Sequence, residues 1–267
     1  MPSVLLRRTG TLVALWWTLV SQELAIRYRG TLLGRIWPLL LPLLMLALYG
    51  FVFGVVFRAR WPGLAGDDHM GFTLNLFAGL LVHGVFAETI GQAPGLMQRH
   101  SNFIRKMVFP LPVLVAVPLG TSLFNAAFGF VLLFCANGFL GSGWHLTVLA
   151  LPVLLLPYLL MLYGLALLLA ALGVYIRDLG QVVGMLVMVV LFTAPVFFPA
   201  DMVPSALAGV VRFNPIAWPV DAVRAVVLRG ELFDPMAWIG YLAVALLVFA
   251  LGRTAFALLR RGFADLL

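Results

Sequence analysis

The feature that most constrains this chain is a run of about twenty residues without charge, from Trp37 to Phe57, placed directly after a basic segment. That segment contains Arg27, Tyr28, Arg29 and Arg35. A helix of about twenty apolar residues crosses a hydrocarbon core of about 30 Å. Because basic flanks stay in the cytoplasm, the sequence predicts a membrane span over 35–57 that runs outward from a cytoplasmic, basic collar.

The composition agrees with a membrane protein. Of 267 residues, 63% are hydrophobic and 10% are charged, whereas about a quarter of a soluble domain is charged. Twelve basic residues fall on the predicted cytoplasmic side: Arg7, Arg8, Arg27, Arg29, Arg35, Arg99, Arg105, Lys106, Arg177, Arg253, Arg260 and Arg261. Five fall outside: Arg58, Arg60, Arg212, Arg224 and Arg229. The net charge of +7 therefore reflects topology, and we expect no nucleic-acid partner.

The hydrophobic pattern predicts an all-α membrane protein with six spans and both termini in the cytoplasm. The spans are expected at 35–57, 71–92, 110–139, 148–173, 181–199 and 236–258. Residues 11–29 form an amphipathic pattern that predicts a helix lying in the membrane interface. We therefore divide the chain into an N-terminal part, 1–34, and a six-helix membrane domain, 35–267. Two segments before the last span, 204–213 and 219–228, are too short to cross, which predicts re-entrant or interfacial helices on the outer side.

Ionisable residues are rare in the predicted spans. Glu88 and His83 lie in the second span, where a charged group is a functional candidate by default. Glu88 lies about one turn from the cytoplasmic end, so it can snorkel or pair with a loop arginine; a proton relay is the alternative. Glu23 and Arg27 have the spacing of a side-chain pair on one helix face.

An aromatic stripe follows the first span, because Tyr49, Phe53 and Phe57 are each one turn apart. Such a stripe serves packing or lipid contact in one interpretation. In the other it lines a path along which a sugar chain slides, since sugar C–H faces stack on aromatic rings.

Several chemistries are excluded by the residues present. The single cysteine, Cys135, offers neither a disulfide nor a thiolate metal site. The single lysine, Lys106, stands between Arg105 and Met107, so the Gly-Lys-Ser/Thr phosphate loop is missing. We expect no catalytic residue, no metal site and no cofactor in this chain. A membrane-embedded enzyme of lipid or glycan assembly is the competing hypothesis, and it requires polar residues that converge within the membrane.

Four motifs carry a resemblance to a known family. They are RYRGTLLGRIWPLLLPL from Arg27, SNFIRKMVFPLPVL from Ser101, GVYIRDLGQ from Gly173 and FNPIAWPVDAVRAVVLRG from Phe213. Together they resemble the permease subunits of type-2 ABC exporters for lipid-linked polysaccharides such as O-antigen, capsule or teichoic acid. The likeness runs from about Gln22 to the C-terminus.

The resemblance implies a multi-pass protein of the bacterial inner membrane that moves a lipid-linked polysaccharide from cytoplasm to periplasm. It implies a homodimer with two separate nucleotide-binding ATPase subunits, which would hold ATP and Mg. A periplasmic export partner is a further candidate, and the identity of the polysaccharide stays open. The near alternative is a type-2 permease for a small hydrophobic drug or lipid.

The resemblance also assigns expected roles. The substrate path would use Arg27, Tyr28, Arg29, Arg35, Trp37, Tyr49, Phe53 and Phe57. Coupling to the ATPase subunit would use Asn102, Phe103, Arg105, Lys106, Arg177 and Asp178. A periplasmic gate would use Phe213, Asn214, Pro215, Trp218 and Arg224.

Overall fold

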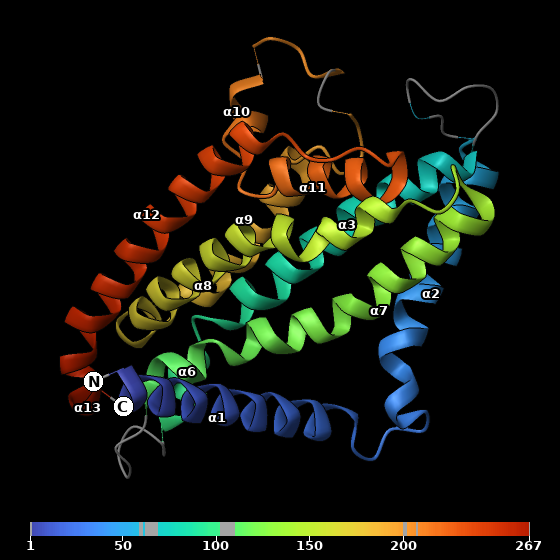
Figure 1. Ribbon diagram of the computed structural model, residues 1–267. Coiled ribbons are helices and arrows are strands. Elements are labelled where there is room, and N and C mark those ends of the chain that lie inside the picture. The colour runs from blue at the N-terminus through green and yellow to red at the C-terminus, as the bar shows by residue number, and fades with distance from the viewer. Residues whose placement is uncertain are drawn as a thin grey trace.

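The computed structural model describes residues 2–58, 61, 69–101, 110–199, 202–206 and 208–266. Within these ranges all regular structure is helical, as Figure 1 shows. The longer helices are α1 (Pro2–Tyr28), α2 (Trp37–Tyr49), α3 (His69–Gln92), α7 (Val117–Leu140), α8 (Leu151–Tyr175), α9 (Leu179–Thr193) and α12 (Pro235–Leu259). Shorter ones are η1 (Gly34–Ile36), η2 (Gly50–Val56), α4 (Leu96–Arg99), α6 (Leu111–Val115), η3 (Leu146–Ala150), α10 (Ala208–Arg212), α11 (Ala217–Arg224), η5 (Ala225–Arg229), η6 (Arg260–Gly262) and α13 (Phe263–Leu266). The predicted all-α class is confirmed.

Among the residues that the structure describes, five helical segments are long and apolar enough to cross a membrane. They are Trp37–Val56, Met70–Gln92, Leu111–Leu140, Leu146–Tyr175 and Pro235–Gly262. Each corresponds to a predicted span, and most bounds agree within two or three residues, which is the usual uncertainty of a helix end.

The predicted span at 181–199 corresponds to α9, an apolar helix of 15 residues. At about 1.5 Å per residue it is roughly 22 Å long, less than the hydrocarbon thickness. The helix stops because Ala194 is extended and precedes Pro195, which disfavours the helical conformation of the residue before it.

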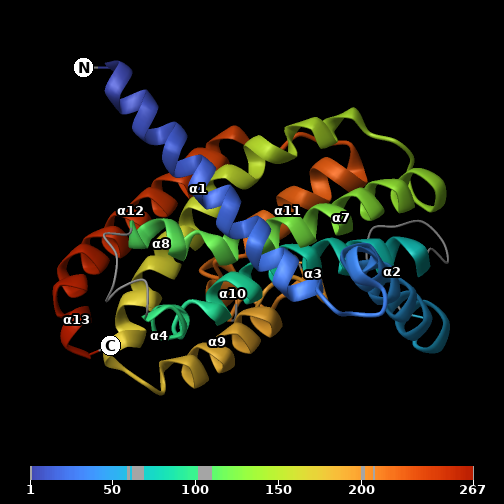
Figure 2. The same cartoon turned by 90° about the horizontal axis from the view of Figure 1, so that it is seen from below.

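Helix α1 lies across the foot of the bundle, beneath α6 and α7 (Figure 1). Seen from below, it crosses obliquely from the N-terminus to the start of α2 (Figure 2). Only part of its apolar side packs on the bundle, because Val20 and Leu24 are buried while Trp17 is 55% exposed. The close approach to α7 depends on Gly120, where a Cβ would lie 2.6 Å from side-chain atoms of Trp16 and Val20.

Helix α2 continues into the π-helical turn η2 and packs antiparallel to α3. Glycines on this helix allow close contact with its neighbour, since Gly50 faces Thr73 of α3 and Gly54 is buried. The opposite side of α2 exposes large apolar residues, including Leu44 and Leu48.

Helix α3 is the central helix, with most of its span buried. It packs antiparallel against α7, since Thr89 bonds Ser122 at 3.0 Å near one end and Leu81 packs on Gly129 farther along. On its other sides α3 contacts α8, α9 and α11. This arrangement brings the end of α1, the start of α2, and the facing sides of α3 and α7 together.

Helices α8 and α12 form the tightest helix pair and run parallel. Trp238 donates to the Val153 carbonyl at 3.1 Å near their first turns, and Tyr175 donates to the Leu259 carbonyl at 2.7 Å near their last. Residue numbers therefore increase in the same direction along both helices, as they do only when two helices run parallel. The chain must therefore return across the bundle between the end of α8 and the start of α12.

The segment before α12 forms two short helical elements, α10 and then α11 with η5, at the end of the bundle opposite α1 (Figure 1). A break at Asn214 and Pro215 separates the two elements, and Gly230 ends the second. Gly230 has a φ of +71°, a left-handed conformation that ends helices and favours glycine.

Candidate functional site

Polar side chains from three helices meet where α1 ends. Arg27 and Tyr28 occupy the last turn of α1, Glu88 projects from α3 and Asn125 from α7. Helix α1 stops here because Gly30 has a φ of +76°. The chain then turns toward α2 and leaves the Arg27 and Tyr28 side chains against α3 and α7.

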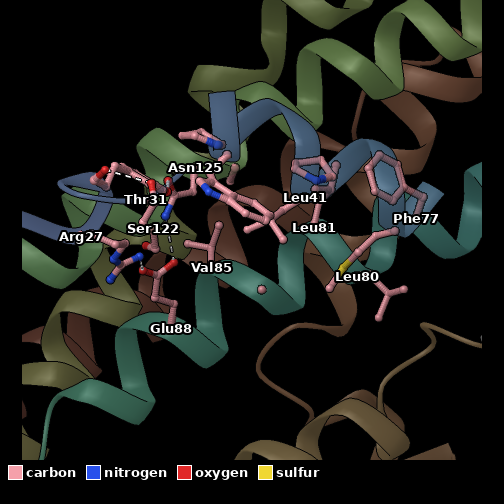
Figure 3. Close-up of a pocket in the computed structure, with 17 residues that line it drawn as sticks. Arg27, Thr31, Leu41, Phe77, Leu80, Leu81, Val85, Glu88, Ser122 and Asn125 are labelled. Carbon is pink, nitrogen blue, oxygen red and sulfur yellow. Dashed lines mark hydrogen bonds and ion pairs between the residues drawn. The ribbon is translucent and has the colours of Figure 1, made fainter. Parts of the chain in front are cut away.

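These residues form one hydrogen-bonded network, drawn in Figure 3. Arg27 makes an ion pair with Glu88 through Nη1 and Oε1. The Tyr28 hydroxyl donates to the Asn125 Oδ1 at 2.8 Å, and Asn125 Nδ2 lies 3.5 Å from the second Glu88 oxygen. The network joins α1 to both α3 and α7. The partner of Glu88 is thus on α1 rather than on a loop, and Arg27 pairs with Glu88 rather than with Glu23.

Burial and charge act against each other at Arg27. Burial disfavours the charged guanidinium, but the hydrogen bond and the negative charge of Glu88 outweigh it, so the pKa of Arg27 is raised. Burial also raises the pKa of Tyr28, which keeps its hydroxyl protonated as the donor to Asn125. The network therefore contains a permanent cation and a neutral phenol.

A cavity of about 510 Å³ opens beside this network, within the range of roughly 300–1,000 Å³ found for small-ligand pockets. Its polar lining, gathered at one end in Figure 3, consists of Arg27, Tyr28, Thr31, Glu88, Ser122 and Asn125. The rest is formed by Trp37, Pro38, Leu41, Pro42, Met45, Phe77, Leu80, Leu81, Gly84, Val85 and Ala126. A cavity with one polar end and apolar walls suits an amphiphilic ligand.

The structure brings only part of the predicted substrate path to this cavity. Arg27, Tyr28 and Trp37 line it, whereas Arg29 is exposed outside it. For Arg35 the backbone lies in η1, and its side chain is outside the described part.

The aromatic stripe begins above the cavity, on the continuation of the same helix. The Phe53 ring centroid lies 6.4 Å from that of Tyr49, 5.8 Å from that of Phe57 and 5.5 Å from that of Phe72 on α3. Tyr49 and Phe53 are half-buried in this packing, and Phe57 is 67% exposed. Within one chain, most of the stripe is therefore a packed seam against α3.

The residues predicted to couple to an ATPase divide into two groups. Asn102, Phe103, Arg105 and Lys106 lie outside the described residues. Arg177 and Asp178 occupy an exposed turn between α8 and α9. Gln98 of α4 donates to the Gly173 carbonyl of α8 at 2.9 Å, so α4 lies at the same end of the molecule as the second group.

The residues predicted as a gate have different environments. Phe213 is 87% exposed, but Asn214 bonds the Val190 carbonyl at 2.9 Å. The Trp218 ring stacks on Tyr241 with centroids 4.9 Å apart, and Tyr241 donates to the Pro215 carbonyl at 2.6 Å. Asn214, Pro215 and Trp218 thus attach the segment between α10 and α11 to α9 and α12.

The environment of Arg224 is the least expected among the five predicted gate residues, because its side chain is only 1% exposed. It donates to the carbonyls of Asn75, Pro195 and Val196 at 3.0, 2.6 and 2.9 Å. It also bonds Asp221 at 3.2 Å and lies over the Trp61 ring at 4.5 Å. Burial lowers the pKa of Arg224 to about 10, which still leaves it charged at neutral pH.

A second set of polar contacts, which sequence reasoning missed, holds the carbonyl groups of η5. Asn137 donates to the Val227 carbonyl at 3.2 Å and Thr147 to the Val226 carbonyl at 2.6 Å, while Ser142 donates to Leu228. A π-helical turn leaves backbone groups that need such partners. The only sequence signal is polar residues in an otherwise apolar region.

Comparison with known proteins gives the chain a family. Residues 14–228 match the model of a family described as "ABC-2 type transporter". The chain is 29% identical over 203 residues to the O-antigen export system permease protein RfbA of Myxococcus xanthus, covering 74% of each chain. It is 23% identical over 216 residues to the protein of that name from Klebsiella pneumoniae, covering 78% of this chain and 77% of the relative. Because the family match spans most of the sequence, the chain belongs to the ABC-2 type transporter family.

Proposed function

We propose that this protein is the membrane permease of an ATP-driven exporter that carries a lipid-linked polysaccharide out of the cytoplasm. The observation that carries the proposal is the combination of the ABC-2 family match with relatives named as O-antigen export permeases over about three quarters of the chain. The chain itself is a transport subunit, and a separate nucleotide-binding subunit hydrolyses ATP.

The topology that goes with this function has six crossings, with both termini in the cytoplasm of the bacterial inner membrane. The parallel course of α8 and α12 supports a crossing between them, which α9 and the turn after it would provide. Helix α1 would lie in the cytoplasmic interface, and α10, α11 and η5 would dip into the membrane from the periplasmic side.

The assembly would be a homodimer with two ATPase subunits. Two short elements support a docking site at one end of the molecule, namely the exposed turn at Arg177 and Asp178 and the anchored helix α4. The segment Asn102 to Lys106 follows α4 directly and carries Arg105 and Lys106. We propose that these residues contact the ATPase subunit.

One observation favours the alternative, a permease for a small hydrophobic drug or lipid. Phe53 packs on Phe72 of the same chain, and the cavity below it is mainly apolar. A polysaccharide path would then need the facing surface of a second subunit to complete it, which the proposed homodimer supplies.

Deletion of the gene in its own host tests the proposal. The expected result is loss of the surface polysaccharide with lipid-linked polymer accumulated inside the cell, because synthesis continues while export stops. Expression of the wild-type chain should restore export, which serves as the control. Normal surface polysaccharide in the deletion strain, together with increased sensitivity to hydrophobic drugs, would support the alternative.

A further inference from the structure

The two ends of the cavity beside α1 differ in chemistry. Arg27, Glu88 and Asn125 form one end, while Leu41, Leu81 and Phe77 line the other (Figure 3). Water needs two to four polar partners to be stable in a cavity, and only the first end provides them. The apolar end therefore suits a hydrocarbon chain.

The polar end favours an anionic group. The Arg27 side chain is 32% exposed and the Glu88 side chain is 23% exposed, so an entering ligand meets more of the guanidinium than of the carboxylate. Arg27 is the sole cation and Glu88 the sole anion among the described lining residues. A guanidinium has five N–H donors in a planar fork that fits a phosphate, and it can serve Glu88 and a phosphate at once.

The cavity opens toward the surroundings of α2. Leu41 and Met45 line it, yet they are 47% and 49% exposed. Both belong to a segment long and apolar enough to cross the membrane. A hydrocarbon chain can therefore pass between the bilayer and the cavity sideways, with its head group left at the level of Arg27.

We propose that this cavity binds the phosphate and the first stretch of the hydrocarbon chain of the lipid anchor of the exported substrate. The inference rests on the proposed function and adds a place for the lipid. The phosphate contacts Arg27, whose guanidinium also pairs with Glu88, and the chain lies along Leu41, Met45 and Leu81. Leu41, Met45, Tyr49 and Phe53 are four residues apart in turn, so the aromatic stripe begins where the cavity ends.

Photo-crosslinking tests this site in the full-length permease, assembled with its ATPase in phosphatidylcholine nanodiscs. The probe is a long-chain alkyl phosphate with a diazirine in the chain, and the matched probe ends in a hydroxyl group. We expect the phosphate probe to label α2 and α3 residues of the cavity at least about tenfold more than the hydroxyl probe, because a charged hydrogen bond contributes that much.

The Arg27→Gln variant should lower labelling by the phosphate probe about tenfold and leave the hydroxyl probe unchanged. The Arg260→Gln variant, at an exposed arginine on another helix, is its control. Glu88→Gln should increase labelling, because it removes the competing anion. Decreased labelling in Glu88→Gln would mean that the ion pair only supports the fold, and would overturn the proposal.

Filling the cavity with a large side chain provides a second, independent test. A Cβ at Gly84 meets open space within the cavity, and a Cβ at Gly91 of the same helix also meets open space but outside it. Gly84→Trp should abolish labelling by the phosphate probe, and Gly91→Trp should retain it. Copurification of both variants with the ATPase checks that they fold.

Four further results would overturn the proposal. Equal labelling by the two probes would indicate a general hydrophobic crevice. Competition by inorganic phosphate as strong as by a polyprenyl phosphate would indicate a free-anion site, and stronger competition by phosphatidylglycerol would indicate a bilayer-lipid site. Absence of labelling in the purified complex, together with normal export by the strain that supplies it, would defeat this inference and leave the proposed function intact. Specific labelling with unchanged export in the deletion strain would instead defeat the proposed function.

Discussion

Arg224 is a buried cation whose charge is distributed over three backbone carbonyls, one carboxylate and one aromatic ring. The carbonyls belong to α3 and to the turn after α9, so the guanidinium ties α11 to two other parts of the chain. A buried carbonyl that loses its donor costs about 1–3 kcal/mol. Arg224 is therefore a structural residue that anchors α11 rather than a side chain that moves freely in a gate.

We expect Arg224→Met to lower the free energy of unfolding by at least about 3 kcal/mol, because three carbonyls lose a donor. The midpoint of thermal unfolding in detergent measures the change. Arg229→Met is the matched control, since Arg229 is 48% exposed and pairs with Glu231, and such surface pairs contribute about 0–1 kcal/mol. Equal midpoints for the two variants would contradict the structural role.

The sequence names Arg224 only as one of five gate residues and does not reveal its environment, because the partners Asn75, Pro195 and Val196 lie 149, 29 and 28 residues away. The same holds for Arg27. Its spacing to Glu23 is visible in the sequence, whereas its pairing with Glu88, 61 residues away, depends on how α1 crosses α3.

At the level of elements, the parallel pair of α8 and α12 depends on two glycines that face each other. A Cβ at Gly252 would overlap the Gly164 carbonyl, and a Cβ at Gly164 would lie 2.5 Å from the Phe249 backbone. Small residues at such crossings let helix backbones approach within a membrane. The close packing of these helices provides a frame against which α9 and α11 pack.

Gly252→Ala should destabilise the protein by about 1–3 kcal/mol, the usual cost of overpacking. Gly240→Ala, on the same helix but with open space around its Cβ, should be neutral or slightly stabilising. Thermal unfolding of the two variants side by side measures the difference. If both variants behave alike, the close contact between the helices is not present in the protein.

The elements themselves are largely predictable, because their signals are local. Apolar runs of about twenty residues predict spans, and Asn214, Pro215 and Gly230 mark the limits of the short helices. The rule that residues before proline avoid the helical conformation could have predicted the end of α9 at Thr193. The predicted span at 181–199 does not take this rule into account. The attachment of η5 by Asn137 and Thr147 was not predictable, since those residues come from distant helices.

At the level of the whole molecule, the proposed order of crossings rests on α8 and α12 running in the same direction. Alkaline phosphatase fused after selected residues tests it, because the enzyme is active only outside the cytoplasm. We expect fusions after Gly95 and Asp178 to be inactive and fusions after Gly143 and Ser205 to be active. An inactive fusion after Ser205 with an active one after Gly143 would mean that α9 does not cross.

The central claim is export of a lipid-linked polysaccharide, and transport by the purified complex tests it most directly. The permease and its ATPase are reconstituted in vesicles with the lipid-linked polymer added to the side where ATP acts. We expect ATP, but not a non-hydrolysable analogue, to move the polymer into the lumen, where an added glycosidase cannot degrade it. Polymer that stays fully degradable while a hydrophobic drug accumulates in the lumen would contradict the claim.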